Sequence, residues 1–180
     1  HPITGVVLQD YNKGIFTVNS IDRILELIRK HDIPYFIDPK FSNFWKFQGA
    51  TLFKPNRKEL MDANSSHKSI SFQEIMKSSA HKLKCEILMC TLAEKGIAYV
   101  EEDKLFYSPA DRIDVVDVSG AGDTSLSIMV LAYLLGYDTS SIATLANLSG
   151  KVVCMKSGVS IMTLDELKSA YFSREETIEK

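Results

Sequence analysis

The sequence lacks any apolar run near the roughly 20 residues that cross a bilayer, and it has no stretch in the form of a signal peptide. Cysteine is scarce as well: Cys85, Cys90 and Cys154 form an odd set with neither zinc-ligand nor redox-motif spacing. We therefore expect no membrane segment, and we expect the thiols to be reduced, small core residues of a cytoplasmic protein.

The chain also lacks an excess of charge of either sign. Its 21 basic and 23 acidic residues are mixed along the sequence and leave a formal net charge of −2. This balance gives no electrostatic reason to expect nucleic acid or a membrane surface as a partner. Repeats, low-complexity tracts and linkers are absent too, so the 180 residues, 45% of them hydrophobic, predict one domain or a piece of one.

The two ends of the chain carry their own indications. The first residues are His1 and Pro2 rather than Met, and an apolar run begins at residue 5. A strand with no preceding cap, turn or helix is typical of a chain entered within a domain, so we expect a further N-terminal portion. Residues 173–180 are predicted to be a charged tail that frays.

Apolar runs of strand length recur in the first half and are nearly continuous, as expected for strands covered on both faces of a parallel sheet. They lie at residues 5–8, 33–37, 50–53 and 86–91. Helical patterns lie between them, at residues 21–29 and, more weakly, at 71–83. Alternation of this kind predicts β-α-β units in an α/β fold with a mostly parallel sheet.

The second half begins with a different pattern. Residues 97–108 are two β-rich pieces around an acidic turn, which predicts a β-hairpin. The chain then becomes helical: residues 124–136 predict a buried helix ended by Gly136, and residues 140–155 predict another. A capping box at residues 163–166 begins the last helix.

The stretch "DVVDVSGAGDTSLSI" at residues 114–128 places a Gly-Ala-Gly turn and an aspartate at the start of the long helix. Backbone amides at a helix N-terminus have no partner within the helix, and the helix dipole adds positive charge there. Gly120, Ala121 and Gly122 leave those amides open to an anion such as a phosphate. Asp123 is repelled by that anion but can accept a proton from a hydroxyl beside it, which is the arrangement that phosphoryl transfer needs.

Two other interpretations stay open on spacing alone. An aspartate at a helix start is a routine cap, and a Gly-x-Gly pair before a helix is weak evidence for a ligand. A dinucleotide fingerprint is the other interpretation, although Ser125 stands where its last glycine belongs.

The motif "DVSGAGDT" resembles the C-terminal signature of the ribokinase-like (PfkB) carbohydrate kinases, and the resemblance covers nearly the whole chain. Val118 replaces the usual threonine and Ile128 a usual small residue, and neither position transfers a proton. The resemblance implies Asp123 as catalytic base and a three-layer α/β/α fold of ribokinase type. It also implies that an N-terminal portion and a β-rich lid are missing, so that residues 1–172 are the C-terminal part of a kinase domain.

Other stretches agree with this family in order and spacing. "KPNRKEL" resembles its N-x-x-E element, which implies that Asn56 and Glu59 organise Mg²⁺ through water around the phosphates of ATP. A capping pair, with Asn56 as N-cap, is an equally physical interpretation. "TLAEKG" resembles the nucleotide-binding turn, which implies contacts from Thr91, Glu94 and Gly96.

Further positions match the family singly. Asn147 matches a position that lines the adenine pocket, and its other interpretation is an exposed polar residue. Asp117, Ser119 and Gly158 fall where some relatives bind a monovalent cation, which would be K⁺.

The sugar is indicated by "LQDYNKG" at residues 8–14 and "IDPK" at 37–40. These stretches resemble the kinase domain of the ADP-heptose synthesis enzymes, which implies ATP-dependent phosphorylation of heptose 7-phosphate on its anomeric hydroxyl, for lipopolysaccharide core sugars. A substrate phosphate needs cationic partners, so Lys13 and Lys40 are candidates, with Asp10 for the sugar hydroxyls. Each is equally well explained as a solvated loop charge.

Alternatives stay open within and outside this family. A kinase for ribose, fructose or a hexose phosphate is the nearest one. A non-catalytic nucleotide-binding fragment is the other, because without its N-terminal part the chain would enclose a sugar poorly and could be inactive alone. Lids in this family often take part in dimer contacts, which makes a homodimer the assembly to consider.

Overall fold

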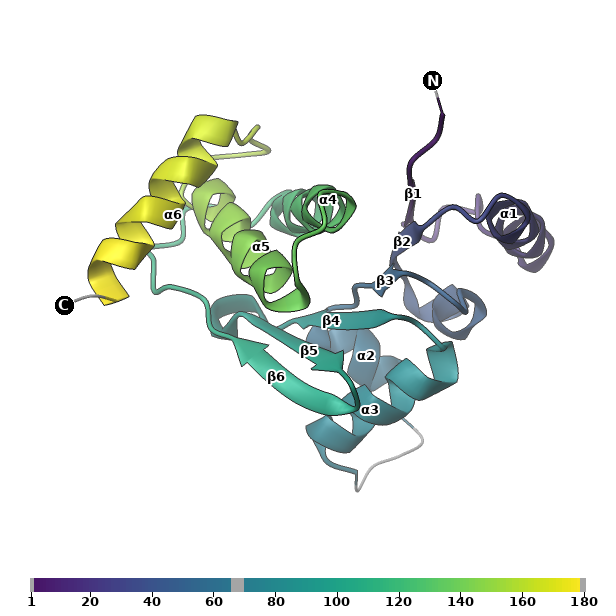
Figure 1. Ribbon diagram of the computed structural model, residues 1–180. Coiled ribbons are helices and arrows are strands. Elements are labelled where there is room, and N and C mark those ends of the chain that lie inside the picture. The colour runs from purple at the N-terminus through teal and green to yellow at the C-terminus, as the bar shows by residue number, and fades with distance from the viewer. Residues whose placement is uncertain (1, 66–69, 179–180) are drawn as a thin grey trace. The chain divides into compact units, whose positions relative to one another are not determined.

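The computed structural model describes residues 2–65 and 70–178, with side chains described as far as Arg174 (Figure 1). Six strands form one sheet and follow one another in it in the order of the chain. They are β1 (Val6–Gln9), β2 (Tyr35–Asp38), β3 (Leu52–Phe53), β4 (Ile87–Thr91), β5 (Ile97–Glu101) and β6 (Lys104–Ser108). β1 to β4 pair in parallel, and β5 and β6 form the antiparallel hairpin, so the predicted mostly parallel sheet with a hairpin is confirmed.

The chain divides into two compact units. The first comprises the residues up to 92 together with residues 98–107, and the second comprises residues 93–97 and 108–180. The sheet belongs almost entirely to the first unit, and the three C-terminal helices belong to the second.

The parallel register brings the carboxyl ends of the first three strands together. Gln9 pairs with Asp38, and Ile37 pairs with Phe53. The next residues, Asp10 after β1 and Lys54 after β3, therefore stand on either side of the end of β2. In open parallel sheets, ligands bind at this edge.

The helices of the first unit follow from amphipathic spacing and from N-terminal caps. α1 (Val18–Lys30) buries Ile21, Leu25 and Ile28 on one face, and Thr17 caps its start. α2 (Arg57–Ala63) and α3 (Phe72–Leu83) also begin with capping boxes, and both contact β4 (Figure 1).

A 3-10 helix, η1 (Phe41–Lys46), carries aromatic side chains into the core of the first unit. Phe44, Phe47 and Phe53 are fully buried, and the ring centroids of Phe44 and Phe53 lie 5.0 Å apart, edge to face. Burying each such ring contributes about 1.5–3 kcal/mol, and the edge-to-face contact adds to this. This packing anchors the chain that follows β2.

The second unit is built from three helices, α4 (Ala121–Leu134), α5 (Thr139–Cys154) and α6 (Leu164–Ile178). α5 packs against both α4 and α6 (Figure 1). Asp138 caps α5 by accepting from the N–H of Ser141 (2.8 Å), and Thr163 and Glu166 form the predicted capping box of α6. α5 is therefore the central helix of this unit.

Some boundaries differ from the sequence predictions. α4 begins at Ala121 rather than at residue 124, because Gly120 supplies the left-handed backbone (φ 80°) that starts it. α6 continues to Ile178, through most of the segment expected as a tail, and residues 179 and 180 lie outside the described residues. Hydrophobic periodicity does not predict α2 or η1, because each is too short to show a clear helical period, and α2 is indicated only by the capping interpretation of Asn56.

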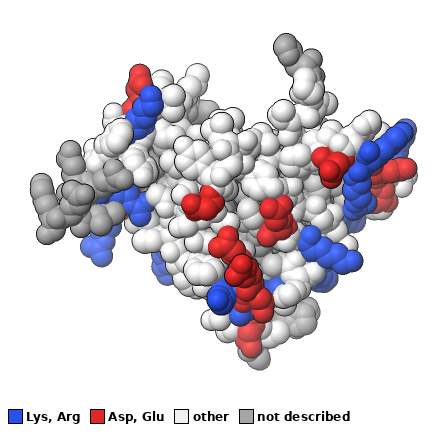
Figure 2. Space-filling model, viewed as in Figure 1, with Lys and Arg blue, Asp and Glu red and all other residues white. Residues whose placement is uncertain are grey.

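Within the residues that the structure describes, every helix is too short or too polar to cross a membrane. On the face drawn in Figure 2, acidic and basic side chains both occur, and neither sign covers it.

The cysteines are free thiols. Burial raises the pKa of Cys85 and of Cys90 to about 12. These two thiols therefore stay protonated at neutral pH and pack as small apolar groups.

Candidate active site

Asp10, directly after β1, is only 2% exposed and is not a solvated loop charge. Its Oδ1 accepts a hydrogen bond from the N–H of Asn12 (2.7 Å), and its Oδ2 accepts one from Nδ2 of Asn43 (3.1 Å). Asn43 is itself buried in η1 and also donates to the carbonyl of Phe16 (3.0 Å). The protein thus orients this carboxylate, whereas Lys13 in the next loop is exposed.

Lys54 and Asp38 form a buried ion pair at the ends of β3 and β2. The Lys54 Nζ to Asp38 Oδ2 distance is 3.0 Å, and the two residues are 3% and 8% exposed. Burial raises the pKa of Asp38, against the lowering influence of the Lys54 ammonium. Each charge depends on the other, because an unpaired buried charge is costly.

Lys40, just after β2, reaches Glu59 in α2. Its ammonium donates to Glu59 Oε1, while Glu59 Oε2 accepts from the N–H of Asn56 (2.8 Å). Burial by itself would lower the pKa of Lys40. The bond to Glu59 and the charges of Asp38 and Asp10 outweigh this effect, so the pKa of Lys40 is raised. Lys40 is therefore held within a cluster of carboxylates.

Asn56 and Glu59 form a capping box at the start of α2. Oδ1 of Asn56 accepts from the N–H of Glu59 (2.8 Å), which confirms the capping interpretation. In the part of the chain that the structure describes, no three His, Cys, Asp or Glu side chains are grouped to hold a metal directly. Both Glu59 oxygens already accept hydrogen bonds, from Lys40 and from the N–H of Asn56, so a Mg²⁺ here would be held through its water shell rather than ligated directly.

The expected nucleotide turn runs from β4 into η2 (Ala93–Lys95). Thr91 forms a parallel bridge with Asn56, which places the end of β4 beside the capping box. The first residue of η2 has a left-handed backbone (φ 53°), which explains why glycine would suit that position. Glu94 is exposed and Gly96 is buried.

Asn147 in α5 is half-buried, so it is not an exposed polar residue. Its Nδ2 donates to the carbonyl oxygen of Ser108 (2.8 Å) and to Ser108 Oγ (3.0 Å). Gly96 packs on the same residue, because a Cβ at Gly96 would lie 2.1 Å from that carbonyl oxygen. Gly96 and Asn147 are therefore brought together around Ser108.

The glycine turn forms the start of α4. Gly120 is the N-cap, and no side chain caps the helix, so Asp123 is not the cap residue. The N–H of Ala121 donates to Val118 (3.2 Å), and the first helical bond runs from Thr124 to Gly120 (2.9 Å). Asp123 lies in this first turn and is exposed, as is the Gly122 beside it. The dipole and the first-turn amides make this helix end suited to an anion.

The three residues expected at a monovalent cation are linked by hydrogen bonds. Asp117 Oδ1 accepts from the N–H of Ser119 (2.8 Å), and Oδ2 accepts from the N–H of Gly158 (3.0 Å). These bonds, that from Ser119 foremost, lower the pKa of Asp117. The carboxylate is therefore ionised at neutral pH and ties the segment before α4 to the loop after α5.

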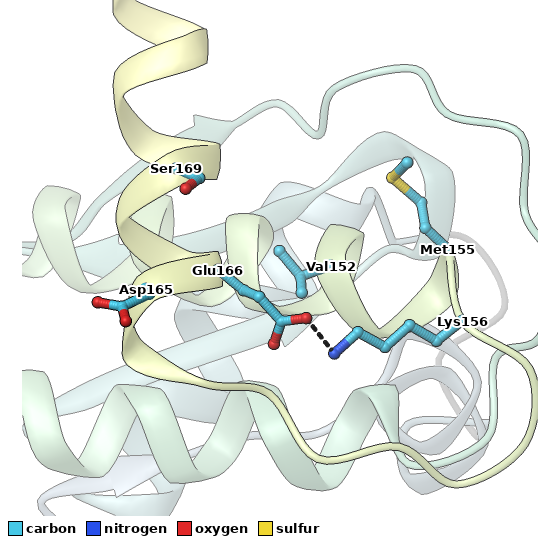
Figure 3. Close-up of a pocket in the computed structure, with 6 residues that line it drawn as sticks. All are labelled: Val152, Met155, Lys156, Asp165, Glu166 and Ser169. Carbon is cyan, nitrogen blue, oxygen red and sulfur yellow. Dashed lines mark ion pairs between the residues drawn. The ribbon is translucent and has the colours of Figure 1, made fainter.

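A pocket of about 420 Å³ lies between α5 and α6 (Figure 3). Its lining residues are Val152, Met155, Lys156, Asp165, Glu166 and Ser169. None of them is a residue that the sequence analysis assigns to a ligand. An ion pair joins Lys156 to Glu166 at this pocket, with 2.6 Å between Nζ and Oε1.

The family model for pfkB family carbohydrate kinases matches residues 16–166. This chain belongs to that family. The bifunctional protein HldE of Rhodopseudomonas palustris (strain BisB18) is 35% identical over 167 residues, which cover 91% of this chain and 34% of the relative. The chain therefore spans about a third of the length of this curated relative.

Solved structures extend the comparison of this pfkB-family chain to its fold. Phosphofructokinase-2 from Escherichia coli, in complex with potassium, matches with a TM-score of 0.84 at 15% identity, over 95% of this chain and 57% of that one. An Escherichia coli protein assigned as a ribokinase II, in complex with ATP and Mg²⁺, matches with a TM-score of 0.78 at 14% identity, over 94% of this chain and 59% of that one. The fold is ribokinase-like, as predicted.

Sequence reasoning missed several polar residues of this kinase-family chain. Asn43 contacts the predicted residue Asp10, the charge of Asp38 acts on the predicted residue Lys40, and Lys54 pairs with Asp38. The sequence did mark Asp38 and Lys54, because Asp38 is the last residue of an apolar strand and Lys54 directly follows another. Asn43 lies within an aromatic-rich 3-10 helix, where no motif singles it out.

Gly96 provides a steric prediction. Its backbone is left-handed (φ 92°), and an added Cβ would meet three backbone atoms between Ser108 and Ala110 at 2.1 to 2.9 Å. The left-handed conformation alone costs about 1–2 kcal/mol for alanine, and backbone cannot move away cheaply. We expect Gly96→Ala to lower the free energy of unfolding by more than that, as measured by urea denaturation.

Gly136 is the matched control for this substitution. It also has a left-handed backbone (φ 80°), but nothing lies within 4 Å of an added Cβ. Gly136→Ala therefore reports the conformational cost alone. Equal losses in the two variants would contradict the close packing at Gly96.

Glu166 provides a pH prediction. Its hydrogen bond with Lys156, together with bonds from the N–H and hydroxyl of Thr163, lowers the pKa of Glu166 from 4.5 to about 2. Because the folded-state pKa is the lower one, this stabilisation is present above the unfolded pKa and is lost as pH falls through the folded value. We expect a carboxyl NMR titration to place Glu166 near the lower value.

Substituting Lys156 separates its contribution to the low pKa of Glu166 from the contribution of Thr163. Lys156→Met is expected to move the Glu166 titration only part of the way back, because both bonds from Thr163 remain. Glu74 serves as the control, since bonds from Ser71 lower its pKa without a lysine. A Glu166 midpoint unaffected by the substitution would exclude the ion pair in solution.

Proposed function

We propose that this chain carries the phosphoryl-transfer part of an ATP-dependent sugar kinase. Its substrate is D-glycero-D-manno-heptose 7-phosphate, phosphorylated on the anomeric hydroxyl to the 1,7-bisphosphate used in ADP-heptose synthesis. The observation that carries the proposal is the first turn of α4, where an exposed Asp123 follows an N-cap, Gly120, that has no side-chain cap. Membership of the pfkB family supports the reaction class.

In this proposal Asp123 is the catalytic base. A carboxylate in the first turn of this helix can accept the proton of a sugar hydroxyl held beside it. The amides of residues 120–122 form the anion hole, to which the Ala121 N–H contributes by giving up its bond to Val118 (3.2 Å), and these donors stabilise charge that develops on the transferred phosphoryl group. Glycine at 120 and 122 keeps side chains away from that anion.

The first unit supplies the charged groups in this proposal. Asn56 and Glu59 hold Mg²⁺ through water, and the ion supplies charge neutralisation at the nucleotide phosphates when bound. Lys40, an ammonium among carboxylates, and the exposed Lys13 serve the phosphate of the sugar, while the oriented carboxylate of Asp10 accepts from sugar hydroxyls.

The second unit supplies the nucleotide contacts in this proposal. Its Glu94, Gly96 and Asn147 border the nucleoside, and Thr91, at the end of β4 in the first unit, is the remaining contact of the nucleotide turn. K⁺ binds near Asp117, Ser119 and Gly158, whose hydrogen bonds to one another support a common site. The potassium complex of Escherichia coli phosphofructokinase-2, a neighbour in fold, is in keeping with such a site.

Heptose 7-phosphate is favoured over other sugars by the D-Y-x-K-G and D-P-K stretches and by the HldE relatives. The structure adds one supporting observation, because charged residues of both stretches lie close together. Asp10 comes from the first stretch, and Asp38 and Lys40 come from the second. Another sugar kinase, for ribose, fructose or a hexose phosphate, is the second candidate, and the likeness in fold to phosphofructokinase-2 favours it.

The test is a panel of acceptors with the full-length protein, ATP and Mg²⁺. Heptose 7-phosphate, ribose, fructose and fructose 6-phosphate are compared, and phosphorus NMR identifies a new anomeric phosphate. Transfer to heptose 7-phosphate well above the others supports the proposal. Preference for another sugar supports the second candidate, and nucleotide binding without transfer to any acceptor indicates a non-catalytic protein.

A further inference from the structure

Two residues of the second unit, far apart in the sequence, contact the same short segment, residues 108–110. Gly96 ends the nucleotide turn, and Asn147 lies in the middle of α5. The segment begins at Ser108, the last residue of β6. What holds this segment therefore decides where the nucleotide turn lies within the unit.

The contact from Gly96 is steric. The space for a Cβ is filled by the carbonyl oxygen of Ser108, the carbonyl carbon of Pro109 and the N–H nitrogen of Ala110, all within 2.9 Å of the ideal Cβ position. Backbone against backbone leaves no flexible side chain to absorb a displacement. A movement of residues 108–110 is consequently passed to the turn that ends at Gly96.

The contact from Asn147 is polar and uses its whole donor capacity. An amide nitrogen has two hydrogens, and Nδ2 lies 2.8 Å from the carbonyl oxygen of Ser108 and 3.0 Å from its Oγ. The carbonyl of Pro109 is a third, more distant acceptor at 3.5 Å. The Nδ2 group is thus committed to the protein and is not available to donate to a nucleotide base.

α5 also fixes the helix that carries Asp123. Ala146, next to Asn147, accepts a hydrogen bond through its carbonyl from the buried Ser125 Oγ (3.2 Å), two residues after Asp123. Gly150 allows the close approach, since a Cβ there would lie 3.3 Å from Ser125 Oγ. One stretch of α5 therefore contacts both residues 108–110 and the first turns of α4.

We propose that Asn147 is a positioning residue that fastens residues 108–110 to α5, so that the nucleotide turn keeps a fixed place relative to the first turn of α4. The role rests on the proposed function of these two turns. It differs from a contact to adenine, because it acts through Ser108 and is independent of the base. Ser108, Ser125 and Gly150 belong to the same arrangement.

The test uses Asn147→Ala and Asn147→Asp in the full-length protein. Both lose the donor, but the aspartate keeps an oxygen that a base could still bond. We expect faster amide hydrogen exchange at Ser108 and Ala110 in both variants. We also expect affinity for Mg²⁺-ATP and Mg²⁺-ITP to fall by about tenfold alike, because the two hydrogen bonds that hold Ser108 are lost whichever base is bound, with KM raised more than kcat is lowered.

Thr144→Ala, on the same helix, is the control and should change none of these quantities. A loss confined to the adenine nucleotide, full activity in Asn147→Asp, or unchanged exchange at residues 108–110 would each overturn the positioning role. A wild-type protein that binds no nucleotide would overturn the proposed function and the nucleotide role of Asn147 with it. In that case amide hydrogen exchange at residues 108–110 would still show whether the side chain of Asn147 stabilises Ser108.

Discussion

Asp123→Asn is expected to abolish sugar phosphorylation while nucleotide affinity stays within several-fold of wild type. The amide keeps the size of the carboxylate but cannot accept the hydroxyl proton, and general-base catalysis is worth about 10²–10⁴ in rate. Asp123 is exposed and lies in the first turn of α4, so the substitution leaves packing unchanged. The measurements are kcat with the preferred sugar and calorimetric binding of Mg²⁺-ADP, both on the full-length protein.

Asp165 offers a matched control for this substitution. It is also an exposed aspartate in the first turn of a helix, α6, and no role in catalysis is proposed for it. Asp165→Asn is expected to leave both kcat and affinity unchanged. Turnover in Asp123→Asn close to that of the control would reject the assignment of the base.

Lys54→Met is expected to give the largest loss of stability among single substitutions proposed for this chain. It leaves the Asp38 carboxylate buried without the ammonium that lies 3.0 Å away. Breaking a buried pair in this way costs about 3–5 kcal/mol. Urea unfolding measures the loss, and Lys58→Met, which breaks an exposed pair with Asp62 in α2, should change stability little.

The deficit of Lys54→Met should depend on pH. Burial raises the pKa of Asp38 above 3.8, and removing the lysine removes a lowering influence on it. A carboxyl that binds its proton more tightly when folded loses stability as pH rises, so the deficit is smaller at mildly acidic pH than at neutral pH. Asp38→Asn combined with Lys54→Met removes both charges and should restore most of the stability. A pH-independent deficit, or no recovery in the double variant, would show that lost packing of the lysine stem dominates.

Much of this fold follows from local sequence pattern. The apolar runs before Asp10 and Asp38 mark strands, and the spacing of Ile21, Leu25 and Ile28 marks α1, because period and burial are linked directly. The start of α4 does not follow in this way. Glycine and alanine in sequence give no helical period, and the start is set by the left-handed backbone of Gly120.

Candidate site residues could be proposed from the sequence where a local motif marks them, but contacts between residues distant in the sequence could not. The turn before Asp123 has a local physical signature. The pairing of Asp38 with Lys54 depends on strand register, since Ile37 opposite Phe53 is what makes the following residues neighbours. The partner of Asn147 likewise depends on the packing of α5 and cannot be obtained from spacing along the chain.

The N-x-x-E element has a consequence for mutagenesis of such proteins. Asn56 and Glu59 hold each other's backbone N–H groups, so a truncation at either position is expected to destabilise the start of α2 whatever its effect on chemistry. Alanine scanning there would merge a folding defect with a kinetic one. Glu59→Gln retains an oxygen for the N–H of Asn56 and gives up only the charge that meets Lys40. Isosteric exchange, rather than truncation, is therefore the way to test the proposed Mg²⁺ role of this element apart from its capping of α2.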